Sequence, residues 1–216
     1  MYDVIVIGAG AAGLMAAATA ARNGKQVLLM EKMEKAGRKI RISGKGRCNL
    51  TNARPPEEFR EAIRVNADFF DVAFAEFNNK ATIRLFERLG VKLDIERGQR
   101  VFPHSGKAWD IANALADYCA DNGVTFMYDT RVNGILTSNG KVYGVTYINK
   151  RGFERKEEAP AVIIATGGVS YPATGSTGDG YLFADELGHT VTEVRPSLTP
   201  LRTSHPQRKF LDGLLL

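Results

Sequence analysis

The sequence predicts an α/β fold, in which a mostly parallel sheet carries helices on both faces and an antiparallel β-meander replaces one crossover helix. Three observations predict it. A strand, a glycine turn, a helix and a second strand open the chain. Three short strands follow one another closely between residues 131 and 158, and a further apolar strand at 161–165 ends in a pair of glycines.

The composition is that of an ordinary globular protein. Of 216 residues, 44% are apolar and 25% are charged, so a sizeable core can form and disorder is not indicated. The two cysteines, Cys48 and Cys119, form no CxxC pair, which argues against a disulfide framework or a zinc site. The net charge of +5 suits a nucleic-acid partner or a bound dinucleotide pyrophosphate.

The start of the chain shows no targeting signal. Met1 leads directly into a strand pattern, without a basic region or a cleavage site. No apolar run approaches the roughly 20 residues that a membrane-spanning helix needs. We therefore expect a cytoplasmic protein with no membrane partner.

The opening unit has the order strand, helix, strand. Residues 2–7 are predicted to form a strand, of which residues 4–7 are a continuous β-branched run. Residues 14–23 are rich in alanine and end before Gly24, and residues 26–30 form a second apolar run that ends at Glu31. This order is typical of a domain that binds a dinucleotide.

The turn between the first strand and the helix carries the glycines that such a domain requires. Gly8 permits a tight turn, Gly10 lets the backbone approach a pyrophosphate, and Gly13 lets the helix lie close to the strand. The helix amino terminus then offers free N–H groups to the anion. Glu31 stands where a carboxylate accepts hydrogen bonds from ribose hydroxyls.

Residues 32–52 are predicted to form an irregular loop, because few apolar residues there could anchor a regular element. Glycines alternate with cations in this stretch. A solvated basic loop would have this composition, but so would a loop that lies along a phosphate-bearing ligand, which is the interpretation we favour. A flavin-binding domain has such a segment after its second strand.

The middle of the chain is predicted to be helical first and then to return to the sheet. From Pro55 onward, Phe70, Phe74 and Phe77 recur at helical spacing and are predicted to lie in the core, as are Ile83, Phe86 and Leu89. Two short strands at 91–97 and 100–103 precede a helix that Ser105 could cap and that buries Cys119. A strand at 124–128 follows.

The next strands distinguish one dinucleotide from another. Strands at 131–138 and 141–148 flank Asn139-Gly140, the strongest short hairpin signal, and residues 152–158 complete a meander. In a plain nucleotide domain a helix would make this connection. The meander and the turn after the strand at 161–165 together favour FAD over NAD.

Five segments carry a resemblance to a known family. They begin at Gly8, Gly37, Ser43, Arg100 and Ala165, and read GAGAAG, GRK, SGKGRCNLTN, RVFP and ATGG. They resemble bacterial NAD(P)/FAD-dependent oxidoreductases of the aminoacetone-oxidase, or BaiN-like, family, and the match covers essentially the whole chain. SGKGRCN is its most specific element.

The resemblance implies a glutathione-reductase-like FAD domain interrupted by a β-rich insertion. It places the FAD-binding domain at residues 1–190 and the incomplete start of the inserted domain at residues 191–216. Members of the family are about twice as long, and a carboxyl-terminal segment closes their flavin site. We therefore expect either an amino-terminal part of such a protein or a shortened protein whose flavin pocket is half open.

The resemblance also implies roles for particular residues. Glu31 would hold the adenosine ribose, Val132 would contact adenine through its backbone, residues 39–49 would lie against the flavin, and Thr166-Gly167 would approach the cofactor. The predicted cofactor-binding set is Gly8, Gly10, Ala11, Ala12, Gly13, Glu31, Lys32, Arg38, Lys39, Ser43, Gly44, Gly46, Arg47, Cys48, Asn49, Val132, Ala165, Thr166 and Gly167.

No catalytic residue can be named from the sequence. Lys45 and Arg47 would favour a thiolate at Cys48, but a second cysteine for a redox pair is missing, and tight loop packing explains this residue as well. The three histidines have no metal-ligand spacing, and no metal is expected. Residues 174–180 either face a substrate or cap the helix predicted at 181–187, where Asp179 fits as an acid near the helix start.

The leading hypothesis is an FAD-dependent oxidoreductase with a small-molecule substrate, which takes a hydride from NAD(P)H or from an organic substrate and passes it on. A flavin- or nucleotide-binding module without enzymatic activity is the first alternative. An RNA-associated flavoprotein, suggested by the basic loop, is the second, although no nucleic-acid partner is expected. The sequence makes no prediction about the oligomeric state.

Overall fold

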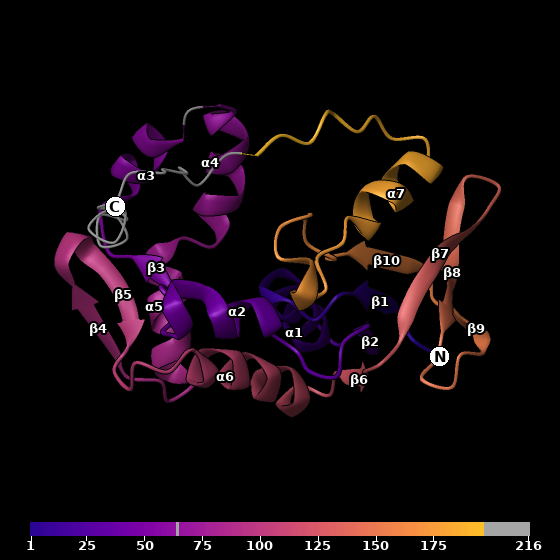
Figure 1. Ribbon diagram of the computed structural model, residues 1–216, viewed down its shortest axis with the longest axis horizontal. Coiled ribbons are helices and arrows are strands. Elements are labelled where there is room, and N and C mark those ends of the chain that lie inside the picture. The colour runs from indigo at the N-terminus through magenta and orange to yellow at the C-terminus, as the bar shows by residue number, and fades with distance from the viewer. Residues whose placement is uncertain (64, 197–216) are drawn as a thin grey trace, which may run out of the picture.

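The structure is a computed structural model that describes residues 1–63 and 65–196 (Figure 1). Its centre is a four-stranded parallel sheet with the order β10-β1-β2-β6. Val4 on β1 pairs with Val27 on β2 and with Ala161 on β10, so the first strand lies between the second and the last. The strands are β1 (Val4–Ile7), β2 (Val27–Met30), β6 (Thr125–Met127) and β10 (Ala161–Ile164). The predicted α/β class is confirmed.

Alternation along the two central strands divides the core into two layers. Val6 and Leu29 belong to a buried cluster with α1 (Ala11–Arg22) and α6 (Ala108–Asp121), which lie together on one face of the sheet. Ile5 and Leu28 point to the other face and join a second buried cluster.

The second face is covered differently from our expectation. The meander β7 (Arg131–Ser138), β8 (Lys141–Ile148) and β9 (Glu154–Glu158) lies against it, and Val132, Val145 and Tyr147 complete its buried cluster. Helix α7 (Asp179–Glu186) adds only Phe183. Helices therefore dominate one face, whereas the expected helical layer on the other face is mostly a sheet. The predicted Asn139-Gly140 turn joins β7 to β8 with both residues at positive φ, as a two-residue hairpin requires.

A second lobe lies beyond the ends of α2 and α6, at the left of Figure 1. It contains the antiparallel sheet β3-β5-β4 and three helices. Its elements are β3 (Thr51–Asn52), α3 (Pro56–Ala62), α4 (Ala67–Glu76), α5 (Asn79–Arg88), β4 (Leu93–Glu96), η2 (Arg97–Gln99) and β5 (Arg100–Pro103).

Several predictions in this part of the chain were wrong. Residues 32–52 are not irregular, because α2 (Arg38–Ile42) and the 3₁₀ turn η1 (Ser43–Gly46) form there, and Ile40 is buried against α6. Helix α4 has no buried residue, so its phenylalanines are not core. Phe70 and Phe74 are half-buried and stack on each other, while Phe77 is exposed. Ser105 lies before the first turn of α6, whose N-cap is Lys107.

The chain beyond α7 is described only to residue 196. Residues 191–196 have no regular structure, and most of the predicted start of an inserted domain at 191–216 lies outside the described residues. No helix in the described ranges is both long enough and apolar enough to cross a membrane.

Candidate functional site

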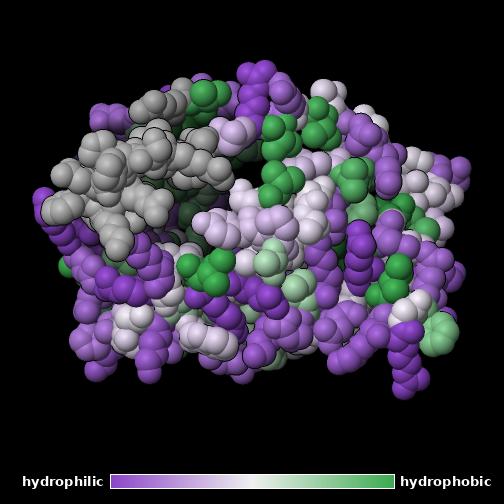
Figure 2. Space-filling view, in the orientation of Figure 1, coloured by the Kyte–Doolittle hydropathy of each residue, from purple (hydrophilic) through white to green (hydrophobic). Residues whose placement is uncertain are grey.

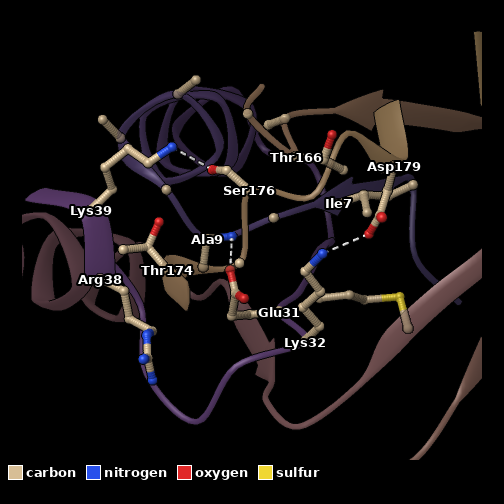
Figure 3. Close-up of a pocket in the computed structure, with 18 of the residues that line it drawn as sticks. Ile7, Ala9, Glu31, Lys32, Arg38, Lys39, Thr166, Thr174, Ser176 and Asp179 are labelled. Carbon is tan, nitrogen blue, oxygen red and sulfur yellow. Dashed lines mark hydrogen bonds and ion pairs between the residues drawn. The ribbon is translucent and has the colours of Figure 1, made fainter. Parts of the chain in front are cut away.

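A cavity of about 520 Å³ opens where the carboxyl ends of β1, β2 and β10 meet (Figure 3). In an open parallel sheet this is the position at which ligands bind. Its lining comes from the turn before α1 and the start of α1, the ends of β1 and β2, α2, the start of β7, and the segment from β10 to the start of α7. The lining residues are Ile7, Gly8, Ala9, Gly10, Ala11, Ala12, Met30, Glu31, Lys32, Lys35, Arg38, Lys39, Ile40, Ser43, Thr130, Val132, Ile164, Ala165, Thr166, Gly167, Thr174, Gly175, Ser176 and Asp179.

Two glycines of the first turn are required by the protein itself. Gly8 has φ +101°, and a Cβ there would lie 2.6 Å from the carbonyl oxygen of Ala165 on the neighbouring strand end. A Cβ on Gly13 would collide with the carbonyl oxygen of Gly8. These contacts hold α1 close to the sheet and bring the two glycine turns together.

Gly10 is different, because nothing in the described chain occupies the space beside it. Apart from its neighbours in the chain, no atom of residues 1–63 and 65–196 lies within 4 Å of the position that a Cβ on Gly10 would take. Gly10 is also the N-cap of α1, no side chain caps that end, and its first turn holds no acidic residue. The free amides and the positive end of the helix dipole therefore face the cavity, which is the arrangement that binds a phosphate group.

Glu31 extends from the end of β2 into the cavity. Its carboxylate accepts hydrogen bonds from the amide of Ala9, at 2.8 Å, and from the amide of Met33, at 2.9 Å. Burial raises the pKa of Glu31, and the two amides offset this only in part. The carboxylate is thus held in one orientation at the edge of the first glycine turn.

Three cations tie the segment between β10 and α7 across the cavity. Lys32 forms a 2.7 Å ion pair with Asp179 at the start of α7. Arg38 donates to the carbonyl oxygen of Ala173, at 2.9 Å, and Lys39 donates to that of Ser170, at 2.8 Å. Figure 3 shows the Lys32–Asp179 pair and the hydrogen bond of Lys39 to Ser176 on different sides of the cavity.

The acid of this ion pair is ionised at neutral pH. Burial alone would raise the pKa of Asp179, but hydrogen bonds from Lys32 and Thr177 outweigh it and hold the pKa below its ordinary value. Asp179 thus binds a specific cation, a role beyond the helix-end acid that the sequence suggested.

The structure brings together thirteen of the nineteen predicted binding residues. Gly13 packs the helix, as described above, and does not line the cavity. The others outside the lining lie on η1 and just after it: Gly44, Gly46, Arg47, Cys48 and Asn49.

Members of that second group make their contacts outside the cavity, within their own segment, with β4 and β5, and, for Cys48, in the buried cluster shared with α1 and α6. A Cβ on Gly44 would lie 2.6 Å from the amide nitrogen of Asn49. Arg47 forms an ion pair with Glu96 and lies over the Phe102 ring, 4.3 Å from its centroid. Cys48 is buried, and burial raises the pKa of its thiol, which favours the loop-packing alternative over the thiolate.

The prediction missed several residues that line the cavity. Ile7, Ala9, Met30, Ile40 and Ile164 directly neighbour or alternate with predicted positions, so the spacing could have included them. Lys35 belongs to the basic stretch from which we chose other members. Thr130, Thr174, Gly175, Ser176 and Asp179 carry no local signal strong enough to separate a ligand contact from a turn.

The chain resembles proteins of known sequence over nearly its full length. It matches the HI0933-like protein Rossmann domain over residues 2–200. A ribosomal RNA dihydrouridine synthase of Haemophilus influenzae is 34% identical, over 97% of this chain and 51% of its own length. A 3-dehydro-bile acid delta(4,6)-reductase of Clostridium scindens is 33% identical, over 97% of this chain and 50% of its own length. The chain thus spans about half the length of these curated relatives.

Solved structures show the same fold. A flavocytochrome c3 fumarate reductase in its open conformation superposes with a TM-score of 0.61 at 23% identity, over 86% of this chain and 40% of its own. A 3-ketosteroid-delta4-(5alpha)-dehydrogenase of Rhodococcus jostii superposes with a TM-score of 0.62 at 20% identity, over 79% of this chain and 46% of its own. At these identities the likeness concerns the fold alone.

Proposed function

Because the chain belongs to the HI0933-like Rossmann domain family, we propose that it forms the FAD-binding half of an oxidoreductase. One observation carries the proposal. The open space beside Gly10, the carboxylate of Glu31 and the turn at Thr166-Gly167 all border one cavity. A dinucleotide needs such features together. Its pyrophosphate requires free amides, its ribose requires an acceptor, and a second glycine turn lets the backbone approach it.

The residues of the cavity fit the adenosine and pyrophosphate parts of FAD. The amides from Gly10 to Ala12 would bind the pyrophosphate, and Glu31 would accept hydrogen bonds from the ribose hydroxyls. The backbone at Val132 would contact adenine, and Lys39 and Ser43, which also line the cavity, would lie against the flavin. When bound, FAD would supply hydride transfer, and the chain would bind and orient it.

The names of the relatives suggest the class of reaction. One describes a dihydrouridine synthase and another a delta(4,6)-reductase. Both chemistries add two hydrogens to a carbon–carbon double bond conjugated with a carbonyl group. We propose the same class here, with NAD(P)H oxidised as the donor and the whole protein, twice this length in the relatives, providing the substrate site.

A second candidate concerns the substrate. Relatives named ribosomal RNA dihydrouridine synthase occur in Haemophilus influenzae and, at 32% identity over 99% of this chain, in Escherichia coli. Their names suggest a uridine of ribosomal RNA as the substrate, whereas the name of the bile acid reductase suggests a free small molecule. The alternative without chemistry, a module that binds flavin and is never reduced, differs in its response to NAD(P)H.

Flavin uptake tests the central proposal. The purified chain is incubated with FAD, desalted, and examined for the yellow absorbance of bound flavin. We expect retention in proportion to protein. Retained flavin that bleaches without oxygen when NADH or NADPH is added supports the oxidoreductase, while flavin that stays oxidised supports the binding module. A colourless protein that takes up no FAD contradicts the proposal for this chain.

A further inference from the structure

An exposed aromatic ring lies on the surface next to the cavity. Trp109, the chain's one tryptophan, stands in the first turn of α6 and is 49% exposed. The guanidinium carbon of Arg41 on α2 lies 4.0 Å from the centroid of its ring, and the ammonium nitrogen of Lys35 lies 5.6 Å from it. Lys35 also lines the cavity. We call these three residues the Trp109 platform.

The platform belongs to the most basic stretch of the chain. Residues 32–47 contain seven lysines and arginines but one acid, Glu34. Within the ranges that the structure describes, ion pairs engage Lys32, Arg38 and Arg47, whereas neither Lys35 nor Arg41 forms one. In Figure 2 the surface over α2 and α6, in the lower half of the view, is largely hydrophilic. A polyanion approaching the cavity would therefore meet unneutralised positive charge.

Arg41 is held in place over the ring. Its Nε donates to the carbonyl oxygen of Ala36, at 3.2 Å, and its Nη2 donates to Oδ1 of Asn113, at 3.0 Å. Its Nη1 is buried and has no partner among the described residues. The guanidinium plane is thus fixed beside an indole that keeps half of its surface in solvent.

Joining α2 to α6 does not explain this exposure. An indole that served only to pack two helices would be covered, since its apolar area stabilises a fold when it leaves water. An exposed aromatic ring among ordered cations is instead what proteins use to stack an unpaired base while they neutralise the neighbouring phosphates.

We propose that the Trp109 platform binds single-stranded RNA, with one unpaired base on the indole and the adjacent phosphates near Lys35 and Arg41. The surface itself does not depend on which dinucleotide fills the cavity, but the choice of RNA over DNA rests on the second candidate substrate above. A base on Trp109 would place the next nucleotide beside Lys35, at the cavity.

The single tryptophan makes the contact directly measurable. Because Trp109 is the only source of tryptophan fluorescence in the chain, stacking of a base on its ring should quench that fluorescence as a single-stranded RNA oligonucleotide is titrated in. We expect saturable quenching that weakens as salt is raised, because phosphate contacts release counterions. Trp109→Ala should lower the affinity for labelled RNA about tenfold, the loss of one stacked base. Trp109→Phe, which keeps an aromatic ring, should retain most of it.

Matched controls separate stacking from net charge. Lys156→Ala removes one positive charge from β9 on the meander, away from the platform, and should change the affinity for RNA far less than Lys35→Ala does. Equal effects of these two variants would overturn the proposal. So would RNA binding without quenching, unchanged affinity in Trp109→Ala, or equal competition by duplex RNA, which keeps its bases paired.

The same preparations distinguish this proposal from the one on FAD. Trp109→Ala should take up FAD as the unmodified chain does and should show the same thermal unfolding. If the unmodified chain takes up no FAD, the proposed function is contradicted, but the RNA titration still tests the Trp109 platform. Absence of RNA quenching with normal FAD uptake would refute the Trp109 platform alone.

Discussion

Two of the segments in which glycines recur close together differ in what fixes them. In the turn from Gly8 to Gly13, two glycines are demanded by backbone atoms of the sheet and the third borders open space. In the segment from Gly37 to Asn49, the first half lines the cavity and the second half packs on β5. Contacts with the sheet fix the position of a glycine turn between a strand and a helix. The position of a glycine-rich basic segment depends instead on the tertiary contacts that its side chains make.

The largest effect should come from Gly13→Ala. Its methyl group would collide with the carbonyl oxygen of Gly8 where neither backbone can yield, so we expect a loss of about 3 kcal/mol in the free energy of unfolding, the upper part of the usual range for overpacking. Chemical denaturation measures it. A variant that unfolds like the unmodified chain would show that this turn is less tightly constrained than the sheet implies.

Glu31→Ala should reduce FAD affinity next most strongly. The ribose hydroxyls would lose their acceptor in a partly closed site, at a cost of about 1–3 kcal/mol. Glu34→Ala provides the control, because that carboxylate pairs with Arg38 on the surface and does not line the cavity. Equal losses in the two variants, measured by FAD titration, would remove the assigned role of Glu31.

Gly10→Ala separates an effect on ligand binding from an effect on the stability of the fold. Its backbone, with φ −78° and ψ −173°, is open to alanine, and nothing in the described chain lies near the added methyl group. We expect an unchanged unfolding midpoint, but FAD binding weakened by at least about tenfold, or 1.4 kcal/mol. If this variant binds FAD normally, the pyrophosphate does not approach the turn at Gly10.

Removing either of two cations in the segment from Gly37 to Asn49 should affect FAD affinity unequally. Lys39 lines the cavity, while Arg47 pairs with Glu96 beside Phe102. Lys39→Ala should weaken FAD binding severalfold, by roughly 1 kcal/mol, and Arg47→Ala should leave it within about twofold. The reverse order, in parallel titrations, would mean that the loop after α2 moves onto the ligand when it binds.

The smallest effects concern the two thiols. Burial raises the pKa of both thiols, and it raises that of Cys119 to about 12. The thiol of Cys119 also donates a hydrogen bond to the carbonyl oxygen of Leu14. Because the thiolate is the reactive form, both should react with a disulfide reagent more slowly than free cysteine near pH 8, where a free thiol begins to ionise. Their rates should rise only at higher pH or on unfolding. Fast modification of Cys48 in the folded chain would restore a redox role for it.

The family resemblance expected from the five motifs is confirmed, and the strand–helix–strand start follows from local signals alone. The hairpin at Asn139-Gly140 is equally local, since both residues accept positive φ. Helix α2 could not be predicted in this way, because Ile40 is buried by α6, seventy residues further along the chain. The Lys32–Asp179 pair likewise depends on β10 carrying the chain back beside β1.

The aromatic stripe of α4 shows the limit of periodicity. Helical spacing indicates which side chains share a face, but it does not say that a partner covers that face. Phe70 and Phe74 stack on each other, and Phe74 also contacts the ring of Phe59 at a tilt, whereas Phe69 remains 84% exposed. Spacing therefore predicted the helix correctly and its burial wrongly.

The place of β1 between β2 and β10 affects the order of events during synthesis. Val4 leaves the ribosome early, but its partner Ala161 and the acid that binds Lys32 emerge after most of the chain. Until then β1 has an unpaired edge, and contacts so distant in sequence form slowly. On the proposed function, a growing chain would therefore complete its nucleotide site only after β10 has been made.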